Sequence, residues 1–158
     1  MKVLIVYDTV SPMKATAKVA ETIREALKEQ GIEVDSFYVK DVDGATVKNY
    51  DCLIAGSPTM YFKASSGIMQ FLNSFSDKEF SGKVATTFDT QLQTRFSGNA
   101  AEGIQKKLKK LGYRMIAPPF VAYVEGKMNS MQLKEGEAEK ARNWAQEVAK
   151  ELSKQSSS

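Results

Sequence analysis

Hydroxyl side chains gather in one short turn near the N-terminus, at Thr9, Ser11 and Thr16. The turn follows an apolar run and precedes a helical pattern, and a helix start can hold a phosphate through its unpaired backbone N–H groups and positive dipole end. Neither a Gly-Lys-Ser/Thr phosphate loop nor G-x-G-x-x-G is present. The turn therefore predicts a phosphate held by hydroxyls and amides. An ordinary loop, with Ser11 capping the helix before Pro12, uses the same residue types.

Two later segments combine polar groups with aromatic rings. Residues 56–63 carry Tyr61 and Phe62 after a Gly-Ser-Pro-Thr sequence, and residues 89–98 carry amides, hydroxyls and Phe96. We expect Gly56 and Pro58 to shape a tight turn. Polar groups beside aromatic faces suit a planar ring that forms hydrogen bonds. The alternative is that these aromatic side chains fold back onto the core.

Composition excludes several classes of protein. The 158 residues contain no histidine, which removes His-based triads and His-type zinc sites, so we expect no catalytic side chain and no metal ligand. A net charge of +3 gives no argument for nucleic acid, and no apolar run reaches the length of a membrane span or of a signal peptide core. A cytoplasmic location follows as the expectation. The single Cys52 lies in an apolar run and predicts a buried, inert thiol.

Apolar segments alternate with helical patterns along the whole chain. Strands are predicted at residues 2–7, 33–39, 51–56, 83–88 and 115–124. Helices are predicted at 12–29, 64–76, 97–111 and 135–152, with one or two further turns in 40–50. This alternation is typical of an α/β fold whose parallel sheet is covered on both faces, with a ligand at the carboxyl ends of the strands. We expect a single domain over residues 1–152 and a frayed tail over 153–158. The lysines of 106–110 are expected to form the solvated face of a helix.

The chain resembles a flavodoxin over nearly its whole length. The resemblance rests on the first turn ending at Thr16, on Gly56-Ser57-Pro58-Thr59, on Phe71-Leu72, on Phe88-Asp89-Thr90 and on the Ser97–Ala101 segment. It implies a three-layer, doubly wound, five-stranded parallel sheet in the order 2-1-3-4-5. It also implies one non-covalent FMN and electron transfer between redox proteins, with the reactivity belonging to the cofactor.

The resemblance also assigns FMN-binding residues. It implies that the phosphate contacts Thr9, Ser11 and Thr16 and the backbone of Val10, Pro12, Met13, Lys14 and Ala15. It implies that the ribityl chain and ring contact Ser57, Pro58, Thr59 and Met60, with Tyr61 or Phe62 on one ring face and Phe96 on the other. Asp89, Thr90 and Gln91 would line the polar edge of the ring through backbone groups.

The first turn departs from the family pattern. Pro12, Met13, Lys14 and Ala15 stand where the family places a glycine and an asparagine, and the turn is longer. Lys14 adds positive charge near the expected phosphate. The leading prediction is an electron carrier without its own substrate, a monomer that docks transiently with iron–sulfur or flavin proteins. The alternatives are a small FMN-dependent quinone or NAD(P)H reductase and a module that has lost FMN and acts in assembly or regulation.

Overall fold

A mixed β-sheet forms the centre of the molecule in a computed structural model that describes residues 1–9, 14–60, 63–93, 100–127 and 131–156. Its strand order is β2-β1-β3-β5-β7-β8. The parallel strands are β2 (Glu33–Tyr38), β1 (Lys2–Tyr7), β3 (Cys52–Met60), β5 (Val84–Leu92) and β7 (Phe120–Glu125). Counted along the chain, these strands have the predicted order 2-1-3-4-5.

Three two-residue strands extend this parallel sheet. They are β4 (Lys63–Ala64), antiparallel to β3, β6 (Arg114–Met115), parallel to β5, and β8 (Gln132–Leu133), antiparallel to β7. These three short strands add to the five predicted parallel strands, and the sequence analysis did not predict them.

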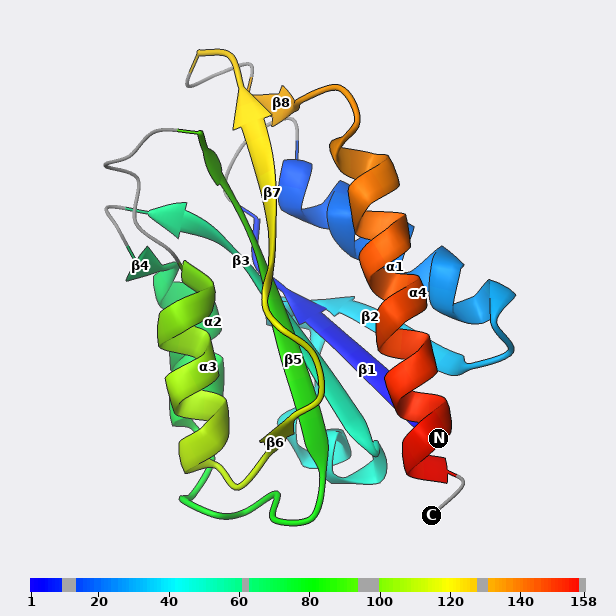
Figure 1. The fold of residues 1–158 in the computed structure, drawn as a ribbon. Coiled ribbons are helices and arrows are strands. Elements are labelled where there is room, and N and C mark those ends of the chain that lie inside the picture. Colours follow the sequence, from blue (N-terminus) through cyan, green and yellow to red (C-terminus); the bar gives the residue numbers. More distant parts are fainter. Residues whose placement is uncertain (10–13, 61–62, 94–99, 128–130, 157–158) are drawn as a thin grey trace.

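Helices cover both faces of the sheet and make three layers (Figure 1). The helices α1 (Ala15–Glu29) and α4 (Glu137–Ser156) cover one face, and α2 (Ser66–Asn73) and α3 (Ala100–Lys110) cover the other. Two 3₁₀ turns, η1 (Val39–Asp41) and η2 (Gly44–Asn49), fill the stretch where one or two turns were predicted.

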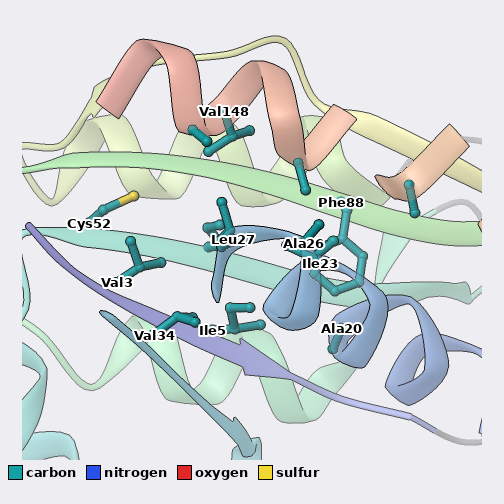
Figure 2. Packing of buried hydrophobic residues seen from close by; sticks show 14 of the residues in the cluster. Val3, Ile5, Ala20, Ile23, Ala26, Leu27, Val34, Cys52, Phe88 and Val148 are labelled. Atoms are coloured by element: carbon teal, nitrogen blue, oxygen red, sulfur yellow. The ribbon is translucent and has the colours of Figure 1, made fainter. Parts of the chain in front are cut away.

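Side chains of β1 alternate between the two layers of core. Val3 and Ile5 pack with α1 residues such as Ile23, as Figure 2 shows, whereas Leu4 and Val6 pack on the face of α2 and α3. This alternation follows from the two-residue period of a strand, and a central strand buried on both faces must be apolar throughout. Cys52 is buried in the same layer as Val3, which confirms its predicted burial, and burial raises the pKa of its thiol to about 12.

The strands β3 and β5 each run four residues past their predicted ends. Gly56 and Pro58 therefore lie within β3 rather than in a tight turn, and the register continues through Pro58 opposite Thr90. A Cβ on Gly56 would lie 2.1 Å from Cζ of Phe88, so Gly56 is required by strand packing. Sequence reasoning assigned this glycine to a turn because turns and close backbone approaches both select glycine.

Other boundaries differ by a few residues. The predicted strand 115–124 is split into β6 and β7, and α1 begins at Ala15 with Lys14 as its N-cap, rather than with Ser11 as the cap. The helix α4 continues to Ser156, so residues 153–156 are helical although they were expected in the tail. Gly31 and Gly112 follow α1 and α3 with φ of 80° and 101°, the left-handed conformation in which glycine commonly ends a helix.

Candidate functional site

Three segments meet at the carboxyl end of the parallel sheet: the residues after β1, the β3–β4 hairpin and the end of β5 (Figure 1). Each expected site residue that the structure describes belongs to one of them or to the start of α1. Seven further expected site residues, Val10, Ser11, Pro12, Met13, Tyr61, Phe62 and Phe96, lie outside the described residues.

Asp8, Ser65 and Ser57 form a first bridge, which joins the end of β1 to the β3–β4 hairpin. The hydroxyl of Ser65 donates to Oδ2 of Asp8 at 2.6 Å, and the backbone N–H of Ser65 donates to Oγ of Ser57 at 2.9 Å. Oδ1 of Asp8 accepts from the N–H of Thr9 at 2.8 Å. All three bridging side chains are buried.

Thr16 and Thr90 form a second bridge, from the first turn of α1 to β5. Their hydroxyl oxygens lie 2.8 Å apart, and both residues are buried. Thr16 was expected to donate to a phosphate, and Thr90 to line a ring through its backbone. In the structure the two side chains satisfy each other.

Thr59 and Asp89 form a third bridge, from β3 to β5 and onward to α3. The hydroxyl of Thr59 lies 3.3 Å from Oδ2 of Asp89 and accepts the N–H of Ala100 at 3.0 Å. Oδ2 of Asp89 accepts the N–H of Ala101 at 3.2 Å, and the side-chain amide of Gln91 donates to the same carboxylate. Burial raises the pKa of Asp89, opposed by these neutral donors. Among the described residues, no positively charged group contributes to this shift.

Together the three bridges join the three segments in pairs. They use the side chains of Thr16, Ser57, Thr59 and Asp89, which sequence reasoning assigned to a ligand or to its surroundings. Every buried side-chain nitrogen or oxygen in the described residues has a hydrogen-bond partner. The bridges therefore hold the site in shape before any ligand enters.

Two bridge residues were missed by sequence reasoning. Asp8 and Ser65 were not assigned to the site, although both belong to its first bridge. An aspartate directly after a buried strand and a serine directly before a helix were the available signals. The packing of β1 beside β3 brings Asp8 and Ser65 together, and the local sequence around each residue does not reveal this packing.

The start of α1 differs from the starts of α2 and α3. Ser65 caps α2, and Thr59 with Asp89 accepts from the first amides of α3. Lys14, the N-cap of α1, has φ 52° and ψ 46° and makes no side-chain capping bond, and the first turn of α1 holds no acidic residue. Amide donors and a lysine ammonium are the groups that bind a phosphate at a helix start. The donors present at α1 therefore fit a phosphate group.

A separate groove of about 370 Å³ lies between α1 and the edge strand β2. Glu21 and Arg24 line it and pair with each other, so their charges are already matched.

In the described part of the chain, no three His, Cys, Asp or Glu residues are grouped so that they could hold a metal ion. No helix among those residues is long and apolar enough to cross a membrane.

Comparison with known sequences identifies the family to which this chain belongs. A family model described as "Flavodoxin domain" matches residues 4–156. A flavodoxin from Clostridium saccharobutylicum is 31% identical over 91 residues, which cover 57% of this chain and 56% of that protein. The chain thus matches a little over half the length of this relative.

Solved structures share the fold at low sequence identity. Flavodoxin 2 of Bacillus cereus matches with a TM-score of 0.79 and 20% identity, over 95% of this chain and 99% of that chain. Rubredoxin:oxygen oxidoreductase of Desulfovibrio gigas matches with a TM-score of 0.80 and 21% identity, over 99% of this chain but 37% of the larger protein. These similarities support the three-layer architecture.

Proposed function

Because this chain belongs to the flavodoxin family, we propose that it binds one FMN at the carboxyl end of its sheet and carries electrons between redox proteins. The family supports a flavin-binding function of the flavodoxin type. FMN as the particular ligand, the residues that contact it and electron transfer between proteins are our proposals.

The uncapped start of α1 is the observation that supports this proposal most directly. Its first amides have no side-chain acceptor in the described residues, and Lys14 stands at the N-cap. The starts of α2 and α3 are occupied by Ser65, Thr59 and Asp89. A phosphate at α1 would accept from those amides and face the positive end of the helix dipole.

The chain's own residues would bind and orient the cofactor. The amides of Ala15 and Thr16 and the ammonium of Lys14 would hold the phosphate, and the β3–β4 hairpin and the end of β5 would place the ring. Bound FMN supplies the electron chemistry. The three bridges would keep these segments in position, because each bridge joins two of them. The first and second bridges are buried, and the third is partly buried.

An electron carrier is favoured over a reductase by the short connections and the composition of this fold. The connections between its helices and strands carry no long inserted loop that could form a separate substrate pocket, and these residues include no histidine. Rapid bleaching of the bound flavin by NADPH in the absence of a partner would favour the reductase.

Titration with FMN and riboflavin tests the proposal. We expect one FMN per chain, bound more tightly than riboflavin and detected by quenching of flavin fluorescence. Replacing Lys14 by glutamine should weaken FMN binding about fivefold, as for the loss of one partly exposed charge interaction, and should leave riboflavin binding unchanged.

A matched control is Lys109→Gln, which removes a positive charge from the exposed face of α3. This variant should bind FMN as the wild type does. Equal losses for FMN and riboflavin in Lys14→Gln would contradict a phosphate at α1, and a wild type that binds neither flavin would contradict the proposed function.

A further inference from the structure

The first bridge joins the two segments that would hold opposite ends of FMN. Asp8 lies directly before the phosphate turn, and Ser57 and Ser65 lie on either side of the hairpin expected at the ring. The connection runs from the N–H of Thr9 through the Asp8 carboxylate to Ser65 and then to Ser57. The side chains of Asp8, Ser65 and Ser57 are buried, so water does not compete for the hydrogen bonds between these three residues, whereas the Thr9 end is partly buried.

The packing around Asp8 leaves little freedom for its carboxylate. The N–H of Asp8 donates to the carbonyl of Gly56 at 3.0 Å, which anchors its backbone to β3. A Cβ on Gly67, in the first turn of α2, would lie 2.5 Å from Oδ2 of Asp8. The glycine therefore makes room for the carboxylate against the start of the helix.

We propose that Asp8 is a positioning residue that fixes the phosphate turn relative to the β3–β4 hairpin, so that the two ends of FMN bind as one unit. The inference rests on the proposed function. A ligand that spans two fixed subsites binds more tightly than its separate halves, because the subsites need no further ordering. Breaking the first bridge removes this advantage while each subsite keeps its own donors.

The direction of the change in FMN affinity distinguishes a positioning role of Asp8 from a simple charge effect. Asp8 is an anionic residue directly before a turn expected to bind an anionic phosphate, so charge repulsion alone predicts tighter FMN binding when the carboxylate is removed. Positioning predicts weaker binding. Measurements on variants of Asp8 therefore decide between the two roles.

The test compares three probes on each protein: FMN, riboflavin and inorganic phosphate, the last by its competition with FMN. In Asp8→Ala and Ser65→Ala we expect the dissociation constant for FMN to rise about tenfold, as for one buried hydrogen bond. Those for riboflavin and phosphate should change less than about twofold, because neither probe spans the bridge. The double variant should lose no more FMN affinity than the larger single loss, because both changes break one connection.

Gly67→Ala breaks the bridge without removing any polar group. The new methyl group must displace the Asp8 carboxylate, whereas alanine favours the helix over glycine. We expect the same selective loss of FMN affinity in this variant. If Asp8→Ala fails to fold, Gly67→Ala still measures the effect of breaking the first bridge.

Asp35→Ala is the matched control. Asp35 accepts a hydrogen bond from the hydroxyl of Tyr50 at 2.7 Å, a carboxylate–hydroxyl pair of similar kind at the edge strand β2. This variant should lose stability but keep the wild-type ratio of FMN to riboflavin affinity. Asp8→Asn keeps one oxygen acceptor and should lie between the wild type and Asp8→Ala.

The outcomes separate this inference from the proposed function. Wild-type binding of FMN with equal losses for all three probes, or tighter FMN binding in Asp8→Ala, overturns the positioning role and leaves the proposed function standing. No flavin binding by the wild type overturns both.

Discussion

The hydroxyls of Thr16 and Thr90 show how much a single side chain depends on its partner. Each is a common ligand-binding type, yet here the two are buried 2.8 Å apart and satisfy each other. Removing one would leave the other unpaired, which costs more than the bond itself contributes. The residue types were visible in the sequence, but their pairing across 74 positions was not.

Asp89 is the residue where burial and charge conflict most clearly. Its carboxylate is fully buried and held by neutral donors, and burial raises its pKa above that in the unfolded chain. Between the unfolded and folded pKa values the folded state binds more protons, so stability falls as the pH rises through this acidic range. A typical paired carboxylate does the opposite.

We therefore expect the advantage of Asp89→Asn over the wild type to grow as the pH rises from about 4 through the acidic range, and then to level off. Urea unfolding at several pH values measures this difference in the free energy of unfolding. A constant difference across the range would show that Asp89 has the same pKa in both states.

At the scale of elements, β3 and β5 determine the shape of the site by continuing past the sheet's apolar core. Their pairing reaches Pro58 opposite Thr90, and the β4 hairpin returns the chain toward α2. Gly56, Pro58 and Asp89 are of residue types depleted in strands, so the sequence predicted loops there. Hydrogen bonding to neighbouring strands outweighed local propensity.

Gly56→Ala tests this packing. The added methyl group would lie 2.1 Å from Cζ of Phe88, between the paired strands β3 and β5. We expect a loss of about 1–3 kcal/mol in the free energy of unfolding, the usual range for overpacking a core.

Urea unfolding measures this loss, and Gly103→Ala in α3 is its control. A Cβ on Gly103 meets no atom within 4 Å, so this variant should be as stable as the wild type or more so. Full stability in Gly56→Ala would mean that the ring of Phe88 moves aside at little cost. The double variant Gly56→Ala/Phe88→Leu should recover part of the loss.

At the scale of the whole molecule, the predicted strand order and three-layer arrangement are confirmed. They follow from apolar periodicity, helix-ending glycines and the handedness of parallel connections, signals that extend over long stretches of chain. The site was predicted in part, because the three segments were correctly placed but the bridges between them depend on tertiary contacts. The contacts of the seven site residues outside the described part of the chain stay predictions.

Buried weak acids make the fold sensitive to alkaline conditions. Burial raises the pKa of Cys52 from 9.0 to about 12, and burial with the Asp35 hydrogen bond raises that of Tyr50 from 10.0 to about 12. Above the unfolded values the unfolded chain releases protons that the folded chain keeps, so stability present below about pH 9 is lost as the pH rises toward 12.

Urea midpoints measured from about pH 8 to about pH 11 should therefore fall steadily. In Cys52→Ala the whole curve should lie lower because of the cavity, but its alkaline slope should be shallower. An identical slope in the two proteins would exclude Cys52 as a source of the effect.

The three bridges also limit how this site can be transplanted or redesigned. Each bridge takes residues from two segments, so a loop exchanged for that of a relative keeps its bridges only where the relative carries the same polar side chains. A graft of the turn from Thr9 to Thr16 that places a residue without a hydroxyl at position 16 would leave Thr90 without its hydroxyl partner. Loop exchange between relatives that differ in these side chains should therefore succeed only when all three segments are moved together, with the site inherited as a single module.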